Sequence, residues 1–357
     1  YVATTENNTN DCATTFTPCA TIQGAIDKAA AGDTIYVADG IFTGTNLDVV
    51  TITKSIILSG GWNSEFDTQT GYSTVYGQNT RRGIKVSNSP SVAIDHFIVK
   101  HGQAYQGGGI QIFNSTVSLD YMLIFNNTAL TTSGGGGIEN QGTLMVNHSM
   151  VFENNAGHGG GISGESDSIT TISNSSIHSN TASFSGGGIY AGYITSLTIN
   201  NSTISNNSAG TTGGGIQTHA STYPEVKVVL NNSTVAENYT HDTEGGISGE
   251  VYLKNSILAN NTTSGLNTLW TTNCTSLKLD GFSIVYPTLC SYSGGPVLNV
   301  NPNLGTFIPA IGYSPLIFGS PAINAGNPAT CLSTDQRGVV RPVGAKCDIG
   351  AFEYRGG

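Results

Sequence analysis

Apolar and polar positions repeat through the middle of the chain at intervals of about 26 residues. A Gly-rich word ending in Ile occurs six times, with spacings of 28, 24, 27, 27 and 31 residues. Each copy is followed by an apolar residue, two variable residues and an Asn, and a further apolar residue lies five positions before that second word. Columns that keep one register indicate a stack of similar units. The six Ile residues are Ile110, Ile138, Ile162, Ile189, Ile216 and Ile247.

The residues within each unit favour short strands joined by tight turns. Runs of Val, Ile, Leu and Thr are separated by Gly and Asn, which tolerate the positive φ of sharp corners. A leucine-rich repeat has a similar period, but its Leu-x-x-Leu-x-Leu pattern is missing. The sequence therefore predicts an all-β fold, a right-handed parallel β-helix with three short strands per coil.

The two ends differ from the repeats. Residues 21–31 place apolar side chains on one helical face, with Thr21 as the N-cap, so a short amphipathic helix should cover the first coil. Periodicity fades after Asn261, and a segment rich in Pro and Cys is expected to close the stack. The predicted organisation is a cap at 1–32, coils at 33–262 and a closing segment at 263–357.

Asn residues form two predicted columns at the corners of the coils. Stacked amides can bond along a column and to backbone groups that the bend leaves unpaired. Many of these residues also lie in Asn-x-Ser/Thr sequons, so glycosylation is the alternative interpretation. The two columns are Asn127, Asn154, Asn180, Asn207, Asn238 and Asn261, and Asn174, Asn201, Asn232 and Asn255, the second being preceded by His96, Tyr121 and His148.

Composition and charge restrict the partners. Only 10% of residues are charged and the net charge is -10, without a basic cluster that could follow a phosphate backbone. We therefore do not expect this protein to bind nucleic acid. No apolar run approaches the length of a membrane span.

Six cysteines fall in three sequence-near pairs outside the repeats. None has the Cys-x-x-Cys spacing of a zinc or redox site, so disulfides in an oxidising compartment are expected. The chain starts without Met or a leader-like segment, and we expect that a signal peptide has been removed. The predicted pairs are Cys12 with Cys19, Cys274 with Cys290, and Cys331 with Cys347.

Two segments resemble known bacterial families. The words Gly-Gly-Gly-Ile and apolar-x-x-Asn, over residues 107–261, are similar to the GGAI and FxxN repeats of polymorphic outer membrane proteins, whose passenger regions are β-helical adhesins. The tail GSPAINAGNPATCLSTDQRGVVRPVGAKCDIGAFEY, residues 319–354, resembles the C-terminal region of choice-of-anchor Q proteins, which are exported β-helical surface proteins. The resemblance implies an extracellular location at a bacterial cell surface.

Asp95 and Asp120 are the first candidate site. Both follow an inward apolar position, so they should project outward on adjacent coils about 4.8 Å apart, with His96 beside them. That geometry suits Ca²⁺ or the two carboxylates of a retaining glycosidase. A solvated pair of surface aspartates is the simpler interpretation.

Two further candidates are less specific. Glu237, Asp242 and Glu244 lie in the longest repeat, where loose Ca²⁺ binding is an alternative to an ordinary acidic loop; otherwise no cofactor is expected. Phe125 and Phe152 share a column. If that column faces outward, the rings form a platform for a sugar, whereas packing beneath a loop is the alternative.

These observations favour a structural or adhesive surface protein over an enzyme. Stacked coils of low charge could associate into filaments or a sheath. The alternative functions are a carbohydrate-active enzyme, either a polysaccharide lyase or a glycosidase, and a carbohydrate-binding module. Self-association, a cell surface and carbohydrate are accordingly the expected partners.

Overall fold

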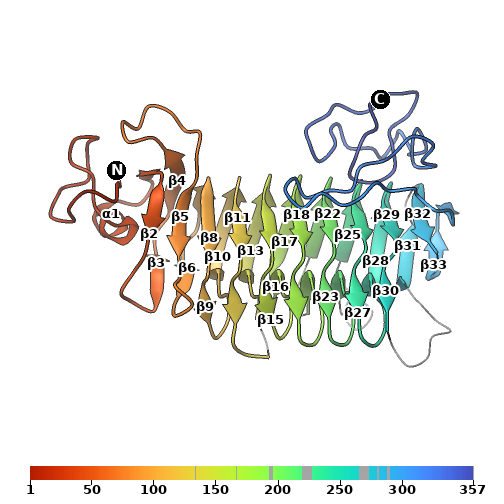
Figure 1. Cartoon of the computed structure of the whole chain (residues 1–357), viewed down its shortest axis with the longest axis horizontal. Coiled ribbons are helices and arrows are strands. Elements are labelled where there is room, and N and C mark those ends of the chain that lie inside the picture. Colours follow the sequence, from red (N-terminus) through yellow and green to blue (C-terminus); the bar gives the residue numbers. More distant parts are fainter. Residues whose placement is uncertain are drawn as a thin grey trace.

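The computed structural model is a right-handed parallel β-helix, as the repeats predict. It has about 9 turns about 27 residues apart and three parallel sheets along its length (Figure 1). The structure describes residues 1–132, 134–165, 167–192, 196–218, 227–264, 273–279, 281–287 and 290–356. Parts of the predicted closing segment, at 265–272, 280, 288–289 and 357, lie outside these ranges.

Sheet 1 has 16 strands, and some of its strands bend halfway along their length. Its members are β1 (Thr34–Ala38), β3 (Asp48–Ile52), β4 (Ile56–Trp62), β6 (Arg82–Ser87), β7 (Val92–Asp95), β10 (Ile110–Asp120), β13 (Ile138–Asn147), β16 (Ile162–Gly164), β17 (Ile169–Ser173), β20 (Ile189–Ala191), β21 (Ser196–Asn200), β24 (Ile216–Thr218), β25 (Lys227–Asn231), β28 (Ile247–Lys254), β31 (Cys274–Leu279) and β33 (Ser291–Gly294).

Sheets 2 and 3 complete each coil with shorter strands. Sheet 2 contains β2 (Gly40–Phe42), β5 (Ser73–Tyr76), β8 (Phe97–Lys100), β11 (Leu123–Phe125), β14 (Met150–Phe152), β18 (Ser176–His178), β22 (Thr203–Ser205), β26 (Thr234–Ala236), β29 (Ile257–Ala259), β32 (Ser283–Tyr286) and β34 (Val297–Leu298). Sheet 3 contains β9 (Gln103–Ala104), β12 (Thr128–Ala129), β15 (Asn155–Ala156), β19 (Thr181–Ala182), β23 (Ser208–Ala209), β27 (Tyr239–Thr240) and β30 (Thr262–Thr263).

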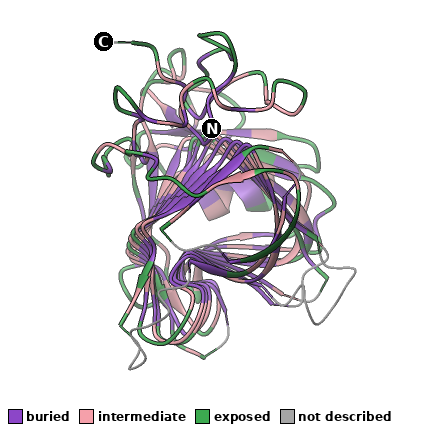
Figure 2. Ribbon diagram, turned by 90° about the vertical axis from the view of Figure 1, so that its right-hand side faces the viewer, coloured by how far each residue is buried: buried purple, intermediate pink, exposed green. Residues whose placement is uncertain are grey.

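Apolar columns fill the interior of the coils. Ile94, Leu119 and Val146 are paired from strand to strand in register, and all three are buried. Alternate residues of these strands point outward, which gives the alternating burial of β7 and β10. Figure 2, turned by 90° from Figure 1, shows the buried strands surrounding this core. Outward residues are therefore the ones available for function.

The first Asn column is a continuous amide ladder at the corner between sheets 2 and 3. The Nδ2 atom of Asn154 donates to Oδ1 of Asn180 at 3.0 Å and to the carbonyl of Ile124 at 2.9 Å. The same Oδ1 of Asn180 accepts from the backbone N–H of Asn154. Each buried amide thus satisfies backbone groups that the turn leaves unpaired. The ladder continues past Asn261 to Asn273, which the repeats did not predict.

The prediction of a second amide ladder was wrong. Asn174, Asn201 and Asn232 occupy the corner between sheets 1 and 2 with φ of 50°, 45° and 43°, but their amides make other contacts or none. Asn174 bonds to Asn147, and Oδ1 of Asn201 has no partner. Asn232 contacts the C-terminal segment instead, as does Asn255. The Asn residues serve here because they tolerate the left-handed backbone.

Serines provide the ladder at that corner. The backbone N–H of Ser149 donates to Oγ of Ser175 at 3.1 Å, and Ser175 donates to Ser202 in the same way. Ser175 and Ser202 are the middle residues of the sequons that begin at Asn174 and Asn201. Asn232 and Asn238 are fully buried, so a glycan on either would disrupt the packed coil.

The predicted N-terminal cap is present. Helix α1 (Ile22–Lys28) begins after Thr21, whose side chain accepts the Gly24 N–H as an N-cap. The Oε1 atom of Gln23 accepts the backbone N–H of Thr51 at 2.7 Å, which occupies an edge group of β3. No helix in the described part of the chain is long and apolar enough to cross a membrane.

The C-terminal part departs from the predicted boundaries. Strands β31 to β34 extend the coils to Leu298, beyond the expected limit at 262. Residues 299–356, here called the strap, do not close the end of the stack but fold back along its side (Figure 1). The strap packs Leu316 and Ile349 against Ile257 of sheet 2.

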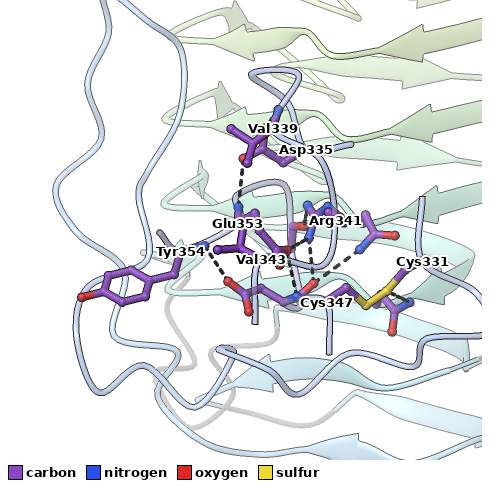
Figure 3. Close-up of polar contacts among 12 residues, drawn as sticks. Cys331, Asp335, Val339, Arg341, Val343, Cys347, Glu353 and Tyr354 are labelled. Atoms are coloured by element: carbon purple, nitrogen blue, oxygen red, sulfur yellow. Dashed lines mark hydrogen bonds and ion pairs between the residues drawn. A yellow bond between two sulfur atoms is a disulfide. The ribbon is translucent and has the colours of Figure 1, made fainter. Parts of the chain in front are cut away.

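A buried ion pair organises the strap. Arg341 Nη1 lies 2.8 Å from Glu353 Oε2, and both side chains are fully buried. The other Glu353 oxygen accepts the backbone N–H of Val343, and Arg341 also donates to three backbone carbonyls. Figure 3 shows the pair among its polar contacts. All six cysteines form the three predicted disulfides, one of which joins Cys331 to Cys347 within the strap.

Candidate functional site

A row of aromatic rings lies on the corner between sheets 1 and 2. His96, Tyr121 and His148 have φ of 55°, 50° and 43°, and successive ring centroids are 4.9 Å apart. Asn occupies the same position in later coils, where it suits the left-handed backbone. Bulky side chains at this position carry a local conformational cost, which points to a use for the side chains.

Each histidine of the row is paired with an aspartate. Oδ1 of Asp95 lies 2.8 Å from Nδ1 of His96, and Oδ1 of Asp120 lies 3.0 Å from Nδ1 of His148. A carboxylate can only accept, so the contact of His148 places its proton on Nδ1 and leaves Nε2 able to take another. Nδ1 of His96 lies between the Asp95 carboxylate and the amide nitrogen of Gln69, 3.1 Å away. The corner therefore carries two oriented acid–base groups on either side of Tyr121.

Asp95 is held more firmly than Asp120. It accepts hydrogen bonds from Ser59 at 3.0 Å and from Gln69 at 2.8 Å, and its side chain is 26% exposed against 40% for Asp120. The two aspartates are paired in register on adjacent strands, as the sequence predicts. Because each carboxylate is bonded to a different histidine, the arrangement favours proton transfer over a shared nucleophile and acid.

The outer face of sheet 2 continues from this corner. Phe125 and Phe152 are stacked with centroids 4.8 Å apart, and both are partly exposed. Lys100 lies 5.9 Å from the Phe125 ring at one end of the row. At the other end His178 stacks on Phe152 at 5.0 Å and is covered by Phe307 of the strap. The stack is thus an open platform at Phe125 and Phe152, whereas His178 is a packed contact beneath the strap. Ligand binding at the platform stays a prediction.

The strap and an N-terminal loop lie at the two ends of the open stretch of sheet 2, by which we mean the outer face that carries Phe125 and Phe152. The loop at 63–72 and the strap rise on the same side of the solenoid toward opposite ends (Figure 1). A pocket of about 260 Å³ lies at the strap end, lined by His148, Met150 and Ser176 from the coils and by strap residues that include Tyr313 and Arg337.

Tyr72 forms part of the same pocket. Its ring lies 6.0 Å from that of His96. Burial, and then the proximity of Tyr121, raise the pKa of the Tyr72 hydroxyl, so Tyr72 stays a neutral hydrogen-bonding group.

The acidic loop residues do not converge. Glu237 follows a strand of sheet 2, and Thr243 donates to Glu244. Asp242 contributes its carbonyl to Thr263. Within the described residues, no three His, Cys, Asp or Glu side chains are grouped to hold a metal.

Sequence reasoning also missed a buried carboxyl group within the coils. Glu139 is fully buried on the outer side of sheet 1, where its Oε2 accepts the Gly135 N–H at 2.6 Å. Burial, with a smaller effect of Glu165, raises the pKa of Glu139 to about 7. Its position in the outward register gave no sign that a loop covers it.

The fold is similar to that of a solved pectate lyase structure. The crystal structure of pectate lyase Pel9A superimposes with a TM-score of 0.64 at 14% sequence identity, covering 99% of this chain and 95% of that one. No protein-family model matches the chain, and no curated protein sequence matches it. At this identity the similarity establishes the parallel β-helix and leaves the chemistry to the residues described above.

Proposed function

We propose that this protein binds a polysaccharide over the open stretch of sheet 2 and cleaves it by acid–base catalysis at the corner row. The proposal depends mainly on one observation: two Asp–His pairs flank Tyr121, next to the Phe125–Phe152 platform. The fold shared with a pectate lyase supports the substrate class.

Elimination is the reaction that best suits these groups. It needs one group to take a proton from the sugar and one to give a proton to the departing oxygen, and it needs no nucleophile. His148 would take the proton on Nε2, with Asp120 holding the imidazole, and the Tyr121 hydroxyl would supply the other. Arg337, which lines the adjacent pocket, would contact a sugar carboxylate while it keeps its ion pair with Asp335, whose Oδ2 lies 2.6 Å from Nη2. The sequence alone placed no cation there.

Turnover on a panel of soluble polysaccharides, acidic and neutral, tests the proposal. Products are measured as new reducing ends and as the ultraviolet absorbance of unsaturated sugars. We expect His148→Gln to lower turnover by about 100-fold or more. His241→Gln, a change in an exposed loop, is the matched control. Absence of both turnover and retention on every polymer would refute the proposal.

The aromatic platform is tested by retention. Phe152→Ala should weaken polymer binding several-fold, because a stacked ring contributes roughly 0.5–1.5 kcal/mol beyond its buried area. Phe113→Ala, which removes an exposed ring on sheet 1, should leave retention unchanged. Equal behaviour of the two variants would argue against the platform.

We also propose an extracellular location at a bacterial surface. Three disulfides favour an oxidising compartment, and the resemblance of residues 319–354 to choice-of-anchor Q proteins supports surface exposure. Fractionation of the source cells, with labelling of intact cells by an impermeant reagent, tests the location. Recovery of the protein only from the cell interior would contradict it.

A structural or adhesive role is the second candidate. The continuous Asn ladder makes a stiff scaffold, which suits a protein that works by its length and shape. Such a protein would bind a surface without turnover and could assemble into filaments. Electron microscopy and light scattering at high concentration test assembly, and a monodisperse monomer would count against it.

A further inference from the structure

A groove lies on the outer face of sheet 1, where its longer strands bend. Residues 88–90, 114–116 and 141–143, from three successive coils, form its floor, and the following coil adds Asp167. We call it the bend groove. Its volume of about 540 Å³ lies within the roughly 300–1,000 Å³ of small-ligand sites. None of the corner-row residues lines it, so it is separate from the site described above.

Buried polar contacts fix the shape of the bend. Oγ of Ser115 accepts the backbone N–H of Ser89 at 3.0 Å and donates to the carbonyl of Phe113 at 2.8 Å, so it joins two coils. On the next coil the N–H of Gly142 donates to Oδ1 of Asn140 at 3.0 Å. A Cβ at Gly142 would lie 2.3 Å from the Ser115 carbonyl oxygen, so the close approach of the two coils requires glycine. The bend groove is therefore a fixed part of the fold.

The floor of the bend groove presents amide groups to solvent. Asn88 and Asn114 are exposed on adjacent coils, and Nδ2 of Asn114 donates to Oδ1 of Asn88 at 3.0 Å. This bond leaves Nδ2 of Asn88 and Oδ1 of Asn114 without a partner among the described residues. Gln141, on the next coil, donates from Nε2 to Glu139 at 3.3 Å and keeps its Oε1 available. Three successive coils thus offer one donor and two acceptors that a ligand can reach.

The lining favours an uncharged ligand that is rich in hydroxyl groups. Asp167 is the only charged residue among the described residues that line the groove, so the groove offers no cation to a sugar carboxylate or to a phosphate. An amide both donates and accepts hydrogen bonds, and so does a sugar hydroxyl. The polar groups of the floor therefore match a neutral saccharide.

Apolar side chains lie beside this polar floor. Ile169 is paired in register with Thr143, and Met145 follows Thr143 on the same face of the strand. Ile169 is 42% exposed and Met145 is 40% exposed. The two side chains can cover the C–H face of a sugar ring while the amides bond its hydroxyls.

We infer that the bend groove is a second glycan-binding site, which holds an internal segment of a neutral saccharide chain and does not cleave it. The groove is open, so a chain can lie in it without presenting an end. General acid–base cleavage needs two proton-transfer groups, whereas Asp167 is the only titratable side chain that the described lining contains. The inference goes beyond the proposed function, because it concerns another face of the solenoid and another class of sugar.

Replacing the two asparagines by glycine tests the bend groove. Asn88 and Asn114 have φ of 54° and 45°, which glycine adopts readily, so the changes remove the amides and keep the bend. Binding of short neutral oligosaccharides of glucose, mannose, galactose or xylose is measured by ligand-observed NMR and calorimetry. Asn114→Gly should weaken the binding about fivefold, the loss expected for one neutral hydrogen bond, and the double variant by more than about tenfold. Asn206→Gly, at an exposed asparagine with φ of 56° on another corner, is the matched control.

Melting temperatures close to that of the native protein should show that all these variants are folded. Oligogalacturonides of the same length should bind the groove more weakly than the neutral sugars, because Asp167 repels their carboxylates. If no neutral oligosaccharide binds, or if the double variant binds all of them as well as Asn206→Gly does, the bend groove is overturned. The proposed function is then still decided separately, by turnover in His148→Gln. Binding that depends on Asn88 and Asn114 supports the groove even where no polymer is cleaved.

Discussion

The Nδ1 atom of His148 lies 3.0 Å from Oδ1 of Asp120, which belongs to the preceding coil. His96, by contrast, is paired with Asp95, its own neighbour in the chain. The two acid–base groups are therefore built differently. The His148 pair depends on the stacking of coils, and the His96 pair on a local turn reinforced by Ser59 and Gln69.

Asp120→Asn should separate catalysis from binding. The amide keeps the size of the side chain but no longer fixes the proton on Nδ1 of His148, so turnover should fall by about 100-fold. Retention and stability should change little, because the side chain is 40% exposed and surface pairs contribute about 1 kcal/mol at most. Steady-state kinetics and thermal denaturation measure both effects. Asp242→Asn is the control, and undiminished turnover in Asp120→Asn would remove the pair from the mechanism.

Asn180→Ala should destabilise the solenoid strongly. The change removes the side-chain donor to the Val151 carbonyl and the acceptor of the Asn154 backbone N–H, and each buried unsatisfied group costs about 1–3 kcal/mol. We expect a loss of about 3 kcal/mol or more in the free energy of unfolding, measured by urea denaturation. Asn155→Ala, at an exposed neighbouring position, should lower the free energy of unfolding by about 0.5 kcal/mol or less. Similar losses in the two variants would mean that the ladder adds little.

Glu139 should make stability depend on pH in a defined direction. Its pKa is about 7 in the folded protein against 4.5 for the ordinary side chain, so the folded state binds the proton more tightly. Its contribution is complete below about pH 4.5 and is lost as the pH rises through about 7. Glu139→Gln mimics the protonated acid, and it should be more stable than the native protein by up to about 3 kcal/mol near pH 8, with no difference near pH 4.5.

Urea denaturation at several pH values checks this prediction. His178 acts in the opposite direction, since burial lowers its pKa to about 4 and its contribution is lost as the pH falls from about 6.5 toward 4. It affects both proteins equally, so the difference between them isolates Glu139. Glu153→Gln, at an exposed position, should show no such difference. A gap that is independent of pH would contradict the assignment.

Glu353→Gln should loosen the strap. Removing one member of the buried pair leaves Arg341 charged without its partner, which typically costs about 3–5 kcal/mol. The double change of Arg341→Met with Glu353→Leu should recover part of that loss. Limited proteolysis of residues 299–356 and urea denaturation are the measurements, with Arg355→Gln as the exposed control. If the single variant resists protease as well as the native protein does, the pair is not what holds the strap.

Local pattern was sufficient to predict most of the solenoid. The inward columns through Leu119 and Val146 and the ladder through Asn154 depend on short repeated words, so spacing alone placed them. The N-cap at Thr21 followed from the helical pattern of the residues after it. The same reasoning put Asp95 beside Asp120. It missed the Ser175 column because the neighbouring Asn residues already explained the turn.

The pocket could not be predicted because its wall comes from a distant segment. Gln336 bonds to Thr203 across 133 positions of the chain, and the strap has no periodicity that would align it with a coil. Burial of Glu139 was missed for a related reason. The repeat pattern shows which positions point outward, but it does not show which of them a neighbouring loop covers.

The strap also changes how force passes through the molecule. Its residues Asn327, Leu332 and Gln336 contact Asn255, Asn232 and Thr203 on three successive coils, in reverse order along the chain. A bare solenoid pulled from its C-terminus can peel one coil at a time. Here the strap is hydrogen-bonded to three coils, so tension at that end loads all three in shear at the same time. We therefore expect the three coils to unfold together as one mechanical unit.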